Sequence, residues 1–253
     1  MIVSDSYFTI GDLHIRSGKP CQDYSIARVM EDRAIAIVSD GCSSGGLVDV
    51  GARILAHAML SSYIEHQAVN IVVDTLRKMM RLEWEDMLAT LVYVYIEPSC
   101  SRLVFFGDGS AVINYVDHTE LILVKYESGA PYYYSYKLSN NYDDYLTMQC
   151  QKKISVMTCI DSNLTMKEIT PEEASSGIFI ELEDNLVSVT IFSDGISSFT
   201  NVDWMEACEE LTYFKNMTGE YLKRRMARAI QDYNKQGIKM MDDIAGASLY
   251  NMR

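Results

Sequence analysis

The chain has 253 residues, of which 48% are hydrophobic, and its formal net charge at pH 7 is -13. This length and composition can supply a sizeable core without covalent staples. The acidic balance argues against nucleic acid as a partner, because binding a phosphate backbone requires clustered Lys and Arg. No apolar run approaches the roughly 20 residues that span a bilayer, and the first residues lack a signal-peptide pattern. We therefore expect a cytoplasmic protein without a membrane partner.

The first half of the chain predicts strands followed by helices. Apolar, β-branched runs predict strands at 7–10, 25–30 and 33–39. The Gly-rich segment 43–46 then breaks the sheet, and apolar residues at helical spacing predict two helices at about 47–63 and 68–82. This order indicates a helix pair packed on a sheet.

The second half repeats this order after a long set of strands. β-Branched and aromatic residues predict strands at 88–96, 102–106, 110–116, 120–126, 153–159, 177–183 and 186–193. The last two strands are expected to form a hairpin across residues 183–185. Two helices at about 203–214 and 218–235 and a final strand at 242–250 complete the pattern. Strands and helical pairs without strict alternation favour an α+β sandwich, with residues 1–253 in one domain.

Residues 127–150 stand apart because they are rich in tyrosine. We expect an irregular insertion here, with two alternatives for its tyrosines. Tyrosine offers a large contact area with few rotamers to freeze, which suits recognition of another protein. The alternative is that the tyrosines pack on the domain's own sheet, and an alternation of Tyr132, Tyr134 and Tyr136 on one strand face would fit it.

Three strand-like runs end in a small residue followed by Asp-Gly. They occupy residues 35–41, 103–109 and 189–195, and the pair Asp242-Asp243 precedes the final apolar segment. A single Asp-Gly is an ordinary turn signal. Three of them at strand ends predict that carboxylates converge at one sheet edge, where they would bind a hard cation such as Mg²⁺ or Mn²⁺. Such a site suits phosphoryl chemistry.

The order of these motifs resembles the metal-dependent serine/threonine phosphatases of the protein phosphatase 2C type, especially the compact bacterial members, over nearly the whole chain. The matching stretches are Gly18–Asp23, Val38–Gly41, Gly107–Ser110, Ser193–Gly195 and Asp242–Ile244. The resemblance implies a four-layer α-β-β-α sandwich in which two mostly antiparallel sheets are flanked by helix pairs. It also implies that the insertion at about 127–150 is a flap beside the active site.

The resemblance assigns a role to each matching residue. Asp40 would bridge two metal ions, with the Gly41 carbonyl, Asp194 and Asp242 completing the principal site. Asp108 would hold a weaker third ion. Gln22, Asp23 and Asp243 would support the site by holding the waters of the metal ions. Carboxylates and a carbonyl suit Mn²⁺ or Mg²⁺ rather than softer ions.

The implied activity is hydrolysis of phosphoserine or phosphothreonine esters in a phosphoprotein, in signalling that opposes a protein kinase. Two cations sharing Asp40 would activate a water molecule for in-line attack on phosphorus, with Asp40, Asp194 and Asp242 as the catalytic set. The family's phosphate-binding Arg is replaced by Gly18, so Arg16 and Lys19 are the candidates for binding phosphate. Cys42 stands where animal-type members have a His.

Two other functions remain open on the sequence. The missing Arg would also fit a noncatalytic phosphatase-like module that binds a signalling partner. In the third interpretation, the chain is an acidic α+β domain whose Asp-Gly turns are structural. Sequence patterns indicate no other cofactor, since neither a nucleotide-binding Gly-rich loop nor a CxxC or HExxH spacing occurs.

Overall fold

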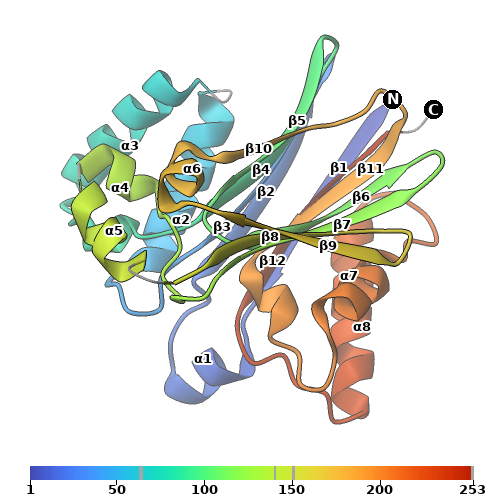
Figure 1. Ribbon diagram of the computed structural model, residues 1–253. Coiled ribbons are helices and arrows are strands. Elements are labelled where there is room, and N and C mark those ends of the chain that lie inside the picture. Colours follow the sequence, from blue (N-terminus) through green and yellow to red (C-terminus); the bar gives the residue numbers. More distant parts are fainter. Residues whose placement is uncertain (63–64, 140, 150–151, 252–253) are drawn as a thin grey trace.

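Two antiparallel sheets form the centre of the computed structural model, which describes residues 1–62, 65–139, 141–149 and 152–251 (Figure 1). The larger sheet has, in spatial order, β1 (Ile2–Thr9), β12 (Ile244–Asn251), β11 (Leu186–Phe192), β6 (Gly109–Tyr115), β7 (Thr119–Tyr126), β8 (Ile154–Ile160) and β9 (Asn163–Ile169). The smaller sheet has β10 (Ile178–Glu181), β5 (Cys100–Phe106), β4 (Leu91–Glu97), β3 (Arg33–Asp40) and β2 (Asp23–Met30).

Helix pairs cover the outer face of each sheet. The pair α2 (Val48–Ser61) and α3 (His66–Met80) lies on the five-stranded side, and the pair α7 (Trp204–Thr212) and α8 (Tyr221–Lys235) lies against the seven-stranded sheet (Figure 1). The result is the expected four-layer α-β-β-α sandwich. Short segments join the layers: α1 (Asp12–Ser17), α4 (Tyr134–Ser139), α5 (Tyr142–Gln149), α6 (Pro171–Ser176) and the 3₁₀ turns η1 (Glu85–Met87) and η2 (Asp194–Ser197).

Burial explains the apolar sequence of β3. Residues 34 to 38 of this strand are fully buried, because the second sheet covers one face and α2 the other. On the opposite side of the molecule, α8 buries Leu222, Met226 and Ala229 at helical spacing and exposes most of its basic residues. None of the helices in the described ranges is both long and apolar enough to cross a membrane.

The prediction of a hairpin across residues 183–185 is wrong. β10 pairs with β5 in the smaller sheet, with Ile178 opposite Phe105, whereas β11 pairs with β6 and β12 in the larger one. The chain therefore crosses between the sheets at a place where local turn residues predicted a direct reversal. Local sequence patterns also did not predict α1, β9 and α6. β9 is an exposed edge strand, so it lacks the apolar pattern by which buried strands are found.

The tyrosine-rich insertion is more regular than expected, because it contains α4 and α5. Most of its tyrosines pack inside the protein, as the second alternative proposed, but none lies on a strand. The buried ones lie in α4, in α5 or just before α4: Tyr132, Tyr133, Tyr134, Tyr136 and Tyr145. Tyr134 and Tyr145 are fully buried, and Tyr145 stacks edge-on against Tyr132 at a centroid distance of 4.9 Å. The Tyr134 hydroxyl donates to Asn70 Oδ1 on α3 at 2.9 Å, which ties the insertion to the helix pair. Residues 63, 140 and 150 of the expected elements lie outside the described residues.

We expect Tyr145→Ala to lower the free energy of unfolding by about 3 kcal/mol, because it empties a fully buried aromatic site. The matched control is Tyr213→Ala, whose side chain is 66% exposed and which should cost less than about 1 kcal/mol. Chemical denaturation of both variants measures the difference. Equal losses would contradict the packing role of the insertion.

Candidate metal centre

A cleft of about 340 Å³ opens where several strands end. Four carboxylates from four separate segments line it, and they are the ones at the predicted strand ends: Asp40, Asp108, Asp194 and Asp242. The loop from Gly41 to Ser44 forms one wall. Gly129, Pro131 and Tyr133 of the tyrosine-rich insertion form part of another. The insertion therefore lies beside the carboxylates, as the resemblance implied for a flap.

Asp40 is the last residue of β3, and Asp23 at the start of β2 is its partner across the strands. The Asp40 amide donates to Thr90 Oγ1 at 3.1 Å, and the Asp40 carbonyl accepts from the Thr90 amide at 2.8 Å. The next residue, Gly41, faces Ala89 in a non-hydrogen-bonded pair, since the flanking bonds use Asp40 and Cys42. This ladder leaves the Gly41 carbonyl oxygen available for a cation.

Asp108 lies in the tight turn between β5 and β6. The turn needs glycine on both sides of Asp108, since Gly107 has φ = 105° and Gly109 has φ = 143°. Asp108 Oδ1 is buried and finds no hydrogen-bond partner among the described residues. A buried carboxylate oxygen without a donor is costly, so this atom indicates a missing positive partner.

The glycine of the Ser193-Asp194-Gly195 motif has a packing role. A Cβ at Gly195 would lie 1.8 Å from the Asp243 carbonyl oxygen, so only glycine lets the end of β11 approach the start of β12 this closely. The Asp242 amide donates to Ser198 Oγ at 3.1 Å, and this bond holds Asp242 in place. Together these contacts place Asp194 and Asp242 on the same cleft.

Asp243 lies behind the cleft and joins three segments. Its carboxylate accepts from the Gly11 amide at 2.7 Å and from the Gln22 amide at 2.7 Å, and it bonds His14 Nδ1 at 2.8 Å. His14 was not among the predicted site residues. No local pattern could have revealed it, because the bond joins residues 229 positions apart. His14, Asp242 and Asp243 are close enough to hold an ion, but His14 and Asp243 already bind each other.

Asp23 and Gln22 also lie behind the cleft. Ser193 Oγ donates to Asp23 Oδ2 at 2.5 Å and accepts from the Ala245 amide at 2.9 Å, so one hydroxyl links both sheets. The Gln22 carbonyl accepts from the Gly41 amide at 3.2 Å. The Gln22 side-chain oxygen is buried and has no hydrogen-bond partner in the described part of the chain, which leaves it free to accept from a bound water.

Burial and mutual repulsion disfavour charge on these carboxyl groups. Burial, followed by the neighbouring Asp23 and Asp194, raises the pKa of Asp40 well above its ordinary value. Burial, followed by repulsion from Asp242, raises the pKa of Asp194 to about 6. Burial likewise raises the pKa of Asp23 to about 8 and that of Asp108 well above its ordinary value. Such a cluster is stable as carboxylates only beside positive charge.

Comparisons with known proteins agree with this geometry. A family model described as protein phosphatase 2C matches residues 10–231. The chain belongs to the protein phosphatase 2C family. Among curated proteins, none matches the chain in sequence.

Solved structures show the same fold at low sequence identity. The serine/threonine phosphatase Stp1 from Staphylococcus aureus has a TM-score of 0.56 and 10% identity, over 100% of this chain and 96% of that one. The phosphatase PstP/Ppp from Mycobacterium tuberculosis has a TM-score of 0.54 and 12% identity, over 100% and 99%. A protein from a study of the bacterial stressosome has a TM-score of 0.52 and 14% identity, over 98% and 99%.

The residues of the cleft fit hard divalent cations. Four carboxylates line it, and carboxylate oxygens are ligands that Mg²⁺ and Mn²⁺ prefer. The other polar side chains of the lining are the Cys42 thiol and the hydroxyl groups of Ser43, Ser44 and Tyr133. The unpartnered oxygen of Asp108 and the available carbonyl of Gly41 supply further ligands. Cations would also offset the repulsion that raises the pKa values of the cluster.

The two candidate phosphate-binding residues lie outside the cleft lining. Arg16 is exposed on α1 and bonds Asp12 Oδ2 at 3.3 Å. Lys19 Nζ donates to the Ser43 carbonyl at 3.0 Å, which places its ammonium group against the loop that lines the cleft. Cys42 Sγ lies 3.1 Å from Ser44 Oγ in the same loop. Lys19 is therefore the better placed of the two cations.

In EDTA, we expect Asp40→Asn to raise the melting temperature by about 2–4 °C, because it removes a repelling carboxyl group from a buried cluster. Millimolar Mn²⁺ should then stabilise the wild type but not the variant. The control Asp143→Asn, on the exposed surface of α5, should behave as the wild type in both conditions. Thermal unfolding followed by fluorescence gives both results, and an equal Mn²⁺ effect in Asp40→Asn would argue against the site.

Proposed function

We propose that this protein hydrolyses phosphoserine and phosphothreonine esters in proteins, using Mn²⁺ or Mg²⁺. Asp40, Asp194, Asp242 and the Gly41 carbonyl would hold two ions, and Asp108 a third. The observation that carries the proposal is the convergence of four partly buried carboxylates, from four segments, in one cleft of a protein phosphatase 2C fold. The partners are then a phosphoprotein substrate and, functionally, the kinase that phosphorylates it.

The residues in and behind the cleft would each have a task in this reaction. When bound, divalent cations would lower the pKa of a water molecule and neutralise the phosphoryl oxygens. Asp40 would keep the ions together as their shared ligand, and it lies close enough to Asp23 and Asp194 for both to raise its pKa. Ser193 and Asp243 hold the ligand-bearing strand ends in place through the hydrogen bonds described above. The Gln22 side-chain oxygen would orient a water by accepting a hydrogen bond from it.

Substrate phosphate would meet little fixed positive charge from the protein. The position of the family's Arg is Gly18, at the end of α1, and Lys19 follows it. A Lys is a point charge and cannot form the two parallel hydrogen bonds of an Arg. Phosphate binding would therefore depend mainly on the bound cations, with Lys19 in support.

The second candidate function is a noncatalytic phosphatase-like module that binds a signalling partner. The absence of Arg at Gly18 is the observation that favours it. Against it stands the retention of all four cleft carboxylates, which would repel one another without a metal. Turnover measurements separate the two functions.

In the presence of Mn²⁺, we expect hydrolysis of p-nitrophenyl phosphate and of a phosphothreonine peptide. Asp40→Asn should lower kcat/KM by more than about 100-fold, because it removes the ligand shared by two ions. EDTA should abolish turnover, and Asp143→Asn should retain it. Absence of turnover in folded wild type with either metal would support the noncatalytic module.

Lys19→Ala should raise KM for the phosphothreonine peptide by about three- to tenfold with a smaller change in kcat, because it removes a cation beside the cleft wall. Arg16→Ala serves as the matched control, because its guanidinium already pairs with Asp12. Steady-state kinetics on both variants measures the difference. If Arg16→Ala raised KM and Lys19→Ala did not, the assignment of Lys19 would be reversed.

A further inference from the structure

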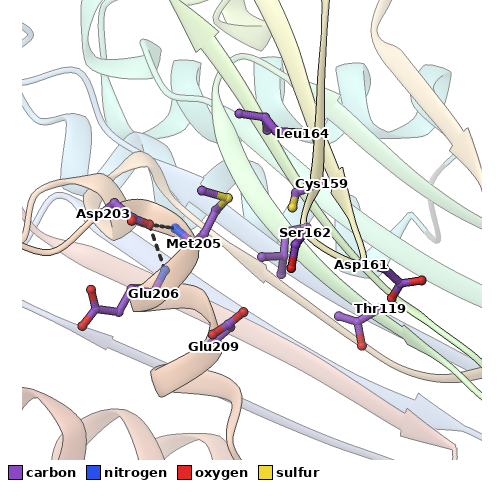
Figure 2. A pocket seen from close by; sticks show the side chains of 10 residues that line it. Thr119, Cys159, Asp161, Ser162, Leu164, Asp203, Met205, Glu206 and Glu209 are labelled. Atoms are coloured by element: carbon purple, nitrogen blue, oxygen red, sulfur yellow. Dashed lines mark hydrogen bonds between the residues drawn. The ribbon is translucent and has the colours of Figure 1, made fainter.

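A second cavity, of about 460 Å³, shares no residue with the metal cleft. It lies between α7 and the distal ends of β7, β8 and β9 (Figure 2). Glu206 and Glu209 come from the helix, and Asp161 and Ser162 come from the turn between β8 and β9. Carboxylates therefore stand on both sides of the groove.

Three of these carboxylates are free to bind an external cation. Within the described ranges, no Lys, Arg or His forms a salt bridge with Asp161, Glu206 or Glu209. Asp203 differs, because its carboxylate caps α7 by accepting from the amides of Met205 at 2.8 Å and Glu206 at 3.0 Å (Figure 2). The cap fixes the start of the helix and thereby the positions of the free carboxylates.

Apolar side chains also line the groove. Leu121, Met205 and Leu164 line it, and Leu164 is 52% exposed although it is a leucine. Met166, two residues further along β9, lies on the same face of the strand and is 63% exposed. β9 is also the outer strand of its sheet, so its far edge has no neighbouring strand among the described residues. An apolar strip thus continues from the groove along an open edge.

A further cavity on the other side of α7 extends the acidic surface. It lies between α7 and α8, and Glu206 and Glu209 line it too, together with Glu210 and Asp232. Tyr233 also lines it and is only 7% exposed, and its hydroxyl has no hydrogen-bond partner among the described residues. A buried hydroxyl without a partner is unfavourable. An ammonium or guanidinium group entering this cavity could donate to the hydroxyl oxygen.

We propose that the two cavities flanking α7 form a docking surface for an extended, cationic segment of the phosphoprotein substrate. Lys or Arg side chains of the segment pair with Glu206, Glu209 and Asp161. One of them also reaches Tyr233, and an apolar side chain covers Leu121 and Met205. The inference rests on the proposed function for the identity of the partner.

Charge complementarity favours this occupant. A phosphorylated residue carries a charge of about -1.5 to -2, and this chain has a net charge of -13, so the two repel each other at long range. A cationic stretch elsewhere in the same substrate reverses that repulsion where it meets α7. Its binding accelerates encounter and adds local concentration at the metal cleft.

The test begins with a fluorescein-labelled peptide in which one leucine is flanked by two basic residues on each side. Its anisotropy on the full chain in EDTA reports binding without turnover. Glu206→Gln combined with Glu209→Gln should weaken binding about fivefold at low salt, with the loss fading at high salt. The control, Glu65→Gln combined with Glu172→Gln, makes the same change in net charge on the side of α3 and α6 (Figure 1). Equal affinities of the two double variants would overturn the docking surface.

Tyr233→Phe removes only the hydroxyl group. If that group were structural, its loss would lower stability, whereas removal of an unpartnered buried hydroxyl should leave stability unchanged or raise it. Docking predicts that the peptide binds about three- to tenfold more weakly to this variant. Unchanged affinity would remove Tyr233 from the surface, and unchanged affinity in the Glu206 and Glu209 variant as well would overturn the proposal.

Kinetics separates this proposal from the proposed function. Two phosphothreonine peptides, with and without the basic segment, are compared with p-nitrophenyl phosphate. The segment should lower KM about fivefold in the wild type and not in the Glu206 and Glu209 variant, while hydrolysis of p-nitrophenyl phosphate stays the same. Equal KM values for both peptides would contradict the docking surface alone. Binding without any turnover would contradict the phosphatase activity and leave a cation-binding surface.

Discussion

Mutual repulsion of closely spaced, partly buried carboxylates is the constraint on which this structure depends. Asp40, Asp108, Asp194 and Asp242 line one cleft, and burial raises the pKa of Asp40 and Asp108 well above the ordinary range. The cluster persists because each carboxylate is attached to an element whose position the core decides. The strand carrying Asp40 has five consecutive fully buried residues before its polar end, so it cannot move to relieve the repulsion. The fold thus holds together carboxylates that repel one another and whose negative charge a bound cation would neutralise.

A single carboxylate behind the cleft keeps distant parts of the chain in register. Asp243 accepts from amides near β1 and β2 and bonds His14, while it also precedes β12. These bonds are charge-assisted and buried, so they are stronger than ordinary surface hydrogen bonds. They join the first two dozen residues of the chain to its last strand. Disturbing Asp243 would therefore displace Asp242 and Asp40 together, although Asp243 itself does not line the cleft.

Local sequence signals predicted much of this arrangement. The Asp-Gly steps lie at strand ends because a buried apolar run must stop before a charged turn, and that is a local property. The four-layer sandwich followed from the resemblance to a known family. The crossing of the chain between sheets after β10 could not be predicted, because residues 183–185 have the composition of a tight turn. His14 was missed for a similar reason, since its partner is fixed by tertiary structure alone.

The tyrosine-rich insertion shows how packing determines local structure. Its sequence lacks a clear helical period, yet it forms α4 and α5, because Tyr134 finds Asn70 and His66 on α3 and stacks edge-on against Phe106. These partners come from α3 and β5, two elements that precede the insertion in the chain. The same packing sets Tyr133 on the wall of the cleft. A segment that looked suited to recognition is thus largely occupied by its own protein, and its cleft-facing part is small.

Because the tyrosine-rich insertion packs mainly on its own protein, other features must explain how an acidic protein attracts a phosphorylated one. With glycine at the family's Arg position, positive charge near the cleft comes from Lys19 and from bound cations. Both act only at short range, because salt screens exposed charges beyond about 8–10 Å. Further attraction would have to come from the substrate itself, at a second surface. A cationic segment meeting the free carboxylates of α7 would supply it, and because the two cavities share no lining residue, docking and hydrolysis could vary independently in sequence.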